Sequence, residues 1–198
     1  MSLKLPSSFY TNPNVVQIAQ HLIGCKLCSN INGVLTAGII VETEAYNGRT
    51  DKACHAFPDK KTPRTQVMYE MGGIAYVYFV YGMHYLFNVV TNKKELADAV
   101  LIRAIEPTDG LEEMYTRRKM NKNGNLLTGG PARLAQALGI DKQLNGENLM
   151  GNKVWIEPRS LDFDEELEET KRIGVDYAGE DANLPWRFSI IGNTFVSK

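Results

Sequence analysis

The stretch Ala75–Val90, AYVYFVYGMHYLFNVV, decides the fold, because it reads as two strands joined by a tight turn. Successive side chains of a strand point to opposite faces of a sheet, so Tyr76 and Tyr78 share one face and Phe79 lies on the other. Gly82 supplies the positive φ that a short hairpin turn commonly needs. The stretch therefore predicts a β-hairpin with its turn at Gly82.

Two features of this hairpin are unusual for a plain core element. Large apolar side chains, Tyr81 and Met83, flank the turn, where polar residues are common. Asn88 stands inside an apolar run, and a buried amide needs hydrogen-bond partners. An aromatic tip with tyrosines behind it indicates a surface that stacks on flat rings or wedges between them. The alternative is a buried hairpin whose tip is covered by a loop.

Length and composition place the chain among globular proteins. With 198 residues, 43% of them hydrophobic, it is long enough for one sizeable core, and we expect a single domain over residues 1–198. No apolar run approaches the roughly 18 residues of a membrane span, so no membrane partner is expected. The N-terminal sequence MSLKLPSSFY is too polar for a signal peptide. Three cysteines, an odd number, favour a reducing, cytoplasmic location.

The charge is distributed unevenly along the chain. A formal net charge of -1 argues against broad nucleic-acid affinity. Residues 157–181, however, hold ten acidic and three basic side chains, so the rest of the chain could present a modestly basic face. This distribution permits DNA binding without predicting it, because a solvated mixed surface explains the same counts.

Helices and strands are mixed along the chain without a βαβ rhythm. A first helix is expected with Pro13 in its first turn, a cap at Thr11 or Asn12 and an end at Gly24. A second is expected at Pro107–Lys119, capped by Thr108 or Asp109. Two more are expected at Ala132–Leu138 and in the acidic, exposed stretch Asp162–Arg172. Strands are expected at Leu35–Tyr46 after an Asn32-Gly33 turn, at Ala99–Ile105, at Val154–Ile156 and within Arg187–Val196. This order predicts an α+β fold with a largely antiparallel sheet.

Two carboxylates near the end of an apolar strand are candidates for chemistry. Glu42 and Glu44 are two residues apart and so share a face. Burying a carboxylate is costly unless it has a partner or a function, and like charges this close should raise one pKa. Paired carboxylates are also the usual groups that hydrolyse glycosidic bonds. The alternative is a strand that ends at the solvent with two ordinary surface acids.

Other polar residues offer fewer clues. Arg103 and Asn88 lie inside apolar strands, and each could contact a glutamate across the sheet. An arginine partner would lower the pKa of that carboxylate. The alternative is an ion pair that only fixes the strand register. His55 lies in an irregular loop, where a histidine is often simply exposed. Cys25 and Cys28 form a lone CxxC without a second pair, so we expect no metal and no cofactor.

A set of motifs occurs in one order along nearly the whole chain. They are VETEAY (41–46), His55, TPR (62–64), YVYFVYGM (76–83), Asn88, RAIEP (103–107), GP (130–131) and RIGVDYAGE (172–180). In this combination the chain resembles the alkyladenine (3-methyladenine) DNA glycosylases of the mammalian methylpurine type. The resemblance runs from the first predicted helix to the C-terminus.

The resemblance implies a fold, an activity and a partner. The fold would be a single mixed domain around a curved antiparallel sheet, with surrounding helices and a β-hairpin that protrudes into the minor groove. The activity would be that of a monofunctional DNA glycosylase, which hydrolyses the N-glycosidic bond of flipped-out alkylated or deaminated purines in base excision repair. The partner would be double-stranded DNA containing damaged purines, bound by a monomer at the bacterial nucleoid, or in the nucleus if the organism is eukaryotic.

The resemblance also implies catalytic and base-binding residues. Glu44 would be the general base that activates water for attack on the sugar, and Arg103 would be the partner that keeps Glu44 ionised. Tyr46, His55 and Tyr78 would be the walls that stack on the extruded purine.

The remaining implied residues concern selectivity and DNA binding. Asn88 would reject guanine by clashing with its exocyclic amino group. Tyr81 would be the wedge that replaces the flipped nucleotide in the stack, with Met83 beside it. Thr62 and Arg64 would contact the DNA.

Overall fold

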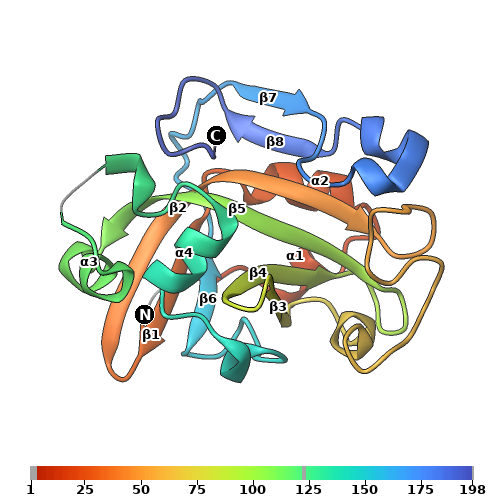
Figure 1. The fold of residues 1–198 in the computed structure, drawn as a ribbon, viewed down its shortest axis with the longest axis horizontal. Helices are drawn as coiled ribbons and strands as arrows, with labels where there is room; N and C mark the ends of the chain where they lie inside the picture. The colour runs from red at the N-terminus through yellow and green to blue at the C-terminus, as the bar shows by residue number, and fades with distance from the viewer. Residues whose placement is uncertain (1–3, 122–123, 198) are drawn as a thin grey trace.

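The computed structural model describes residues 4–121 and 124–197, so the first three residues of the N-terminal stretch discussed above lie outside it. One curled sheet of eight strands organises this part of the chain (Figure 1). The strands are β1 (Lys26–Ile31), β2 (Val34–Asn47), β3 (Ala75–Val80), β4 (His84–Thr91), β5 (Asp98–Asp109), β6 (Val154–Glu157), β7 (Leu167–Thr170) and β8 (Arg187–Ile190). The main path is β3-β4-β5-β2-β1-β6, and β8 joins β2 to β7. Each strand pairing is antiparallel, which confirms the expected α+β class.

Helices cover both faces of the sheet. They are α1 (Ser7–Tyr10), α2 (Val15–Leu22), α3 (Leu111–Arg118) and α4 (Pro131–Ala137), with short 3-10 segments η1 (Gln66–Tyr69), η2 (Gly124–Leu126), η3 (Lys142–Leu144) and η4 (Asp176–Asn183). In Figure 1, α4 lies in front of the sheet and α2 lies behind it. None of the helices within residues 4–121 and 124–197 is long and apolar enough to cross a bilayer.

The central strand β2 has two chemically different faces. Val41 and Ala45 are fully buried in the main hydrophobic core. Thr43 points the same way and donates its hydroxyl to the Ala19 carbonyl of α2 at 2.9 Å. Side chains alternate along a strand, so Glu44 and its even-numbered neighbours point to the opposite face. That face holds the site described below.

Three irregularities interrupt the pairing of β2 with β5, and two of them flank Glu42. Ile40 pairs with Ile105 and Glu42 with Ala104, which leaves Val41 as an extra residue on β2. The next pair after Glu42 with Ala104 skips Arg103, which is then the extra residue on β5. A bulge of this kind redirects side chains locally. The bulge at Arg103 explains how its side chain, on β5, reaches both Glu42 and Glu44 on β2.

The predicted hairpin is present, at the edge of the sheet. Tyr76 pairs with Asn88 across β3 and β4. Three residues, Tyr81–Met83, connect the paired Val80 and His84, and two of them have positive φ, 52° at Tyr81 and 67° at Gly82. The tip is open to solvent, since Tyr81 is 90% exposed and Met83 68%. The alternative of a tip covered by a loop is therefore excluded.

Several predicted elements are also present. Asn32-Gly33 forms the turn between β1 and β2, and the expected strands around 99–105 and 154–156 are β5 and β6. The first helix is present, but its cap was assigned wrongly. The Asn14 side chain accepts hydrogen bonds from the N–H groups of Val16 and Gln17, and so takes the place expected for Thr11 or Asn12.

Two helix predictions were wrong in extent or type. The helix expected from Pro107 begins only at Leu111, because β5 continues to Asp109 and pairs with β2 over that length. The acidic segment from Asp162 contains strand β7 instead of a helix, because β7 pairs with β8, a partner distant in sequence. Local helical propensity is readily overridden by such pairing.

Candidate active site

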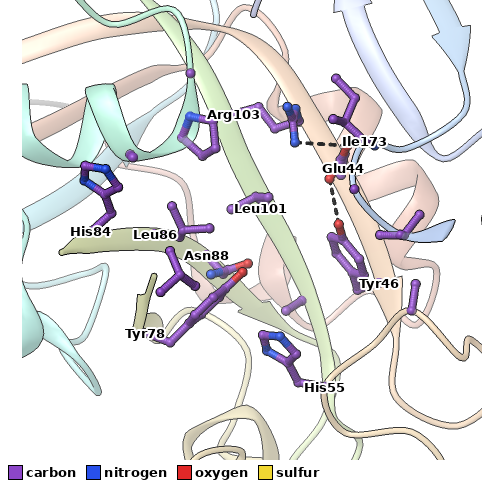
Figure 2. Close-up of a pocket in the computed structure, with 18 of the residues that line it drawn as sticks. Glu44, Tyr46, His55, Tyr78, His84, Leu86, Asn88, Leu101, Arg103 and Ile173 are labelled. Carbon is purple, nitrogen blue, oxygen red and sulfur yellow. Dashed lines mark hydrogen bonds and ion pairs between the residues drawn. The ribbon is translucent and has the colours of Figure 1, made fainter. Parts of the chain in front are cut away.

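A cavity of about 500 Å³ opens on the face of the sheet that carries Glu44 (Figure 2). It lies among β2, β3, β4 and β5, the loop around residue 54, the start of α4 and the segment 173–177. Its lining brings together most of the site residues expected from the sequence: Glu44, Tyr46, His55, Tyr78, Tyr81, Asn88 and Arg103.

Glu44 is a fully buried carboxylate held by donors from three directions. Its Oε2 accepts a hydrogen bond from the Tyr46 hydroxyl at 2.6 Å. Its Oε1 accepts one from the backbone N–H of Ile173 at 2.7 Å and forms an ion pair with Arg103 Nη1 at 3.2 Å. Because all of these partners donate, the surroundings suit a carboxylate that accepts. The alternative of ordinary surface acids is excluded, since Glu42 and Glu44 are both 0% exposed.

Glu42 holds Arg103 in place rather than providing a second acid. Its Oε1 accepts hydrogen bonds from Arg103 Nε at 2.8 Å and from Arg187 Nε at 2.7 Å. The backbone N–H of Ser197 donates to Oε2 at 2.8 Å. Burial alone would raise the pKa of Glu42, but the charge of Arg103 and the hydrogen bonds of this cluster hold that pKa below its ordinary value. The rise expected for one pKa of the glutamate pair is therefore not found at Glu42.

His55 and Tyr78 form an aromatic wall of the cavity. Their ring centroids are 4.7 Å apart in an edge-to-face arrangement. The Arg64 guanidinium lies 5.0 Å from the Tyr78 ring centroid, and its Nη2 lies 3.3 Å from His55 Nε2. An arginine can only donate, so Nε2 accepts and the ring proton is on Nδ1, 3.1 Å from the Tyr76 hydroxyl. Burial, with a smaller effect of Arg64, lowers the pKa of His55 to about 4, so the ring is neutral near pH 7.

Asn88 lines the cavity but does not meet a glutamate. Its side-chain amide donates to the Tyr76 carbonyl at 3.1 Å, across the hairpin. The expectation that Asn88 could pair with a carboxylate across the sheet is therefore wrong. Arg103 alone of these two residues makes that contact.

The residues expected to bind DNA are only partly gathered at the cavity. Tyr81 lines its mouth, and Arg64 contacts its aromatic wall. Met83 is exposed at the hairpin tip outside the lining. Thr62 lies in a turn where its hydroxyl is 3.1 Å from that of Thr65, away from the cavity.

Comparison with known proteins agrees with this geometry. The family model described as "Methylpurine-DNA glycosylase (MPG)" matches residues 8–194. The chain belongs to the methylpurine-DNA glycosylase family. It is accordingly a DNA glycosylase, an enzyme of DNA repair, which confirms the resemblance stated from the motifs.

Relatives of similar length support the same family. A Chlamydia felis protein named "Putative 3-methyladenine DNA glycosylase" is 48% identical over 185 residues, covering 93% of this chain and 94% of its own. A protein of the same name from Natranaerobius thermophilus is 44% identical over 197 residues, covering 98% and 99%. A third, from Clostridium perfringens strain 13, is 44% identical over 207 residues, covering 99% and 100%.

Some parts of this candidate site could not be predicted from the sequence. The backbone N–H of Ile173 binds Glu44, and Tyr177, 70% exposed, lines the cavity with its hydroxyl donating to the Ala53 carbonyl at 3.0 Å. Both belong to the RIGVDYAGE motif, which was noticed but given no role. Ser197 and Arg187 left no signal, because only the fold brings them to Glu42.

Proposed function

We propose that this protein hydrolyses the N-glycosidic bond of alkylated or deaminated purines flipped out of duplex DNA, with a water molecule activated by Glu44. One observation carries the proposal: a buried carboxylate shares a cavity of about 500 Å³ with the rings of Tyr46, His55 and Tyr78, beside an exposed aromatic hairpin tip. A purine is flat and needs such rings, whereas hydrolysis at the sugar needs the carboxylate.

The hairpin tip and the aromatic walls account for the energetics of extrusion. Flipping a nucleotide out of the duplex costs a few kcal/mol, and less at a damaged base. Stacking on an aromatic side chain stabilises a base by roughly 1–3 kcal/mol. Tyr81 fills the gap left in the stack, and Tyr46, His55 and Tyr78 receive the extruded purine. Together these contacts offset the cost of flipping.

The electrostatic character of the walls favours cationic purines. Alkylation at N3 or N7 makes a purine positively charged. A neutral His55, whose pKa is about 4, does not repel such a base, and the tyrosine faces attract it. Asn88 clashes with the exocyclic amino group of guanine and so disfavours undamaged guanine. 7-Methylguanine carries the same amino group, and its release depends on the weaker glycosidic bond of the cationic base.

Glu44 performs the chemical step. A carboxylate oxygen can accept two hydrogen bonds, and within the described residues Oε2 receives one, from Tyr46. Oε2 can therefore also accept the O–H of the attacking water. As the water oxygen forms its bond to the anomeric carbon, its proton passes to Glu44. The bond from that carbon to the purine nitrogen breaks, its electron pair leaves with the base, and an abasic sugar remains.

Arg103 and the DNA-contacting residues complete the assignment. Arg103 forms an ion pair with Glu44 Oε1 at 3.2 Å, and its positive charge balances that of the buried carboxylate. Arg64 leaves the Tyr78 ring when a base enters and then contacts the DNA backbone, because its guanidinium lies against a ring on which the base stacks. Met83 supports the wedge, and the contact of Thr62 with DNA stays a prediction. We also propose that a monomer acts on the duplex, since one cavity is enough to receive one flipped base.

Base release from matched substrates tests this proposal. The substrates are duplexes with a single 7-methylguanine, 3-methyladenine or hypoxanthine, the undamaged duplex, and the corresponding free nucleosides. We expect release from the damaged duplexes, fastest for 3-methyladenine, which is cationic and lacks the amino group that Asn88 rejects, and none from the nucleosides. Cleavage of free nucleosides at a comparable rate, or no release from any damaged duplex, would overturn it.

A further inference from the structure

The motif RIGVDYAGE at residues 172–180 contains a buried arginine with an extensive set of partners. The Arg172 side chain is 0% exposed, as is that of Asp51, with which it forms a two-pronged ion pair. Arg172 Nη1 also donates to the Ala45 carbonyl at 2.9 Å, and Nη2 to the Asp181 carbonyl at 3.0 Å. These bonds fix the plane of the guanidinium with respect to β2 and to the loop that carries Asp51.

Two aromatic rings lie close to this guanidinium. Its central carbon is 4.8 Å from the ring centroid of Tyr46 and 5.3 Å from that of Trp186. A guanidinium near an aromatic ring is attracted to its π-electrons, and its rigid plane limits how the ring can tilt. Arg172 therefore restrains Tyr46, whose hydroxyl donates to Glu44 Oε2.

The backbone next to Arg172 reaches the other oxygen of the same carboxylate. The N–H of Ile173 donates to Glu44 Oε1 at 2.7 Å. Anchoring Arg172 also anchors this N–H, because the two groups are separated by a single peptide unit. One side chain thus controls both the Tyr46 hydroxyl on Oε2 and the Ile173 amide on Oε1.

We infer that Arg172 is a positioning residue for the glycosylase reaction: held by Asp51, it fixes the Tyr46 hydroxyl and the Ile173 N–H that orient the Glu44 carboxylate. The inference rests on the proposed role of Glu44. Arg172 itself does not line the cavity, so it acts through these two groups. A lysine in its place keeps the charge but loses the fork and the flat stacking surface.

The test compares Arg172→Lys with a control that loses a similarly bonded arginine elsewhere. Arg117 on α3 binds Glu113 at 2.9 Å, Thr36 Oγ1 at 3.2 Å and the Ala137 carbonyl at 3.2 Å, and it does not line the cavity. The parent, Arg172→Lys, Arg117→Lys and Glu44→Gln proteins are assayed at a temperature at which all are folded. Two quantities are measured: the single-turnover rate of 7-methylguanine release, and the Kd for the same duplex.

Arg172→Lys should slow release by about 10- to 100-fold while leaving the Kd within about threefold of the parent value, because small displacements of reacting groups affect the rate most. Arg117→Lys should leave both unchanged. If Arg172→Lys keeps the parent rate, slows release no more than Arg117→Lys, or weakens binding in proportion to the rate, the inference is wrong.

Two further variants make the result decisive. If Arg172→Lys does not fold, Trp186→Leu removes one of the two rings near the guanidinium and leaves Arg172 in place. It should slow release severalfold without changing the Kd, and an unchanged rate would contradict the inference. Glu44→Gln separates the two proposals. If Glu44→Gln releases base normally, the proposed role of Glu44 is wrong. If Glu44→Gln is inactive and Arg172→Lys keeps the parent rate, only the role inferred for Arg172 is wrong.

Discussion

His55 is a residue whose protonation is set by its surroundings. Its ring is largely buried, its Nε2 accepts from Arg64, and its Nδ1 lies beside the Tyr76 hydroxyl. Burial is the main cause that lowers its pKa from 6.5 to about 4, and the positive charge of Arg64 acts in the same direction. Protonating His55 would put a second charge next to Arg64 inside the wall of the cavity.

This environment predicts a pH-dependent stability. Between pH 6.5 and 4 the unfolded chain holds a proton on His55 that the folded protein does not hold, so stability falls as the pH falls through that range. The contribution of one such group approaches about 1.4 kcal/mol per pH unit. Urea unfolding from pH 7.5 to 4.5 should show a smaller loss of stability for His55→Gln than for the parent. His21→Gln, at an exposed position of α2, is the control. Parallel profiles for parent and His55→Gln would contradict the prediction.

At the scale of single residues, the sequence predicted the residues of the candidate site better than it predicted their hydrogen-bond partners. Glu44 and Arg103 could be selected as charged residues in apolar strands, whereas Tyr46 was selected only through the family resemblance. The sharing of Arg103 between two glutamates could not, because it depends on a bulge that shifts Arg103 by one position. The Ile173 amide was equally out of reach, since a backbone donor leaves no mark in a side-chain pattern.

Among the elements, the β3–β4 hairpin combines local strain with an exposed apolar surface. Tyr81 has a φ of 52°, in the left-handed region, which costs a residue other than glycine roughly 1–2 kcal/mol, and less for asparagine. Its ring is 90% exposed and so gains little from packing. A tyrosine is thus a poor choice for folding at this position, which supports a use in binding.

Tyr81→Asn should therefore separate stability from function. We expect the free energy of unfolding to stay level or rise by up to about 1 kcal/mol, because asparagine tolerates the left-handed region. Base release should slow by about 10- to 100-fold, since the wedge loses a stacking contact of roughly 1–3 kcal/mol. Thermal unfolding and release from a 7-methylguanine duplex measure the two effects. Leu161→Asn, at an exposed position outside the cavity lining, should change neither; an unchanged release rate in Tyr81→Asn would show that the tip is not a wedge.

Elements that depend on local interactions were predicted correctly, whereas two elements that depend on pairing with distant strands were not. The hairpin and the Asn32-Gly33 turn were predictable because turn residues and side-chain alternation are local signals. The acidic segment was assigned to the wrong type because its strand, β7, depends on pairing with β8. The start of α3 was misplaced for the same reason, since β5 remains paired with β2 up to Asp109.

At the scale of the whole molecule, the fold converts residues far apart in sequence into one cavity. Its lining extends from Glu44 to Ser197 and includes the hairpin between them. The lining residues of the described chain include carboxylate, imidazole, phenol and guanidinium groups, but no lysine. A covalent imine with the sugar, the usual start of strand cleavage by a glycosylase with lyase activity, needs an amine.

The protein should therefore release bases without cutting the strand. An end-labelled duplex with one 7-methylguanine should remain intact after incubation with the enzyme and break at that position only after alkali. The same duplex treated with alkali alone gives the background. Breaks that appear without alkali would show that an amine of the protein attacks the sugar.

The central claim is that Glu44 activates the water that attacks the sugar, and Glu44→Gln tests it most directly. Glutamine keeps the size of the side chain but cannot take a proton from water. The measurement is the single-turnover release of 7-methylguanine together with the Kd for the same duplex. We predict that release falls by at least about 100-fold while the Kd remains close to that of the parent, because the cavity walls and the hairpin are unchanged. Release by Glu44→Gln at the parent rate would contradict the account.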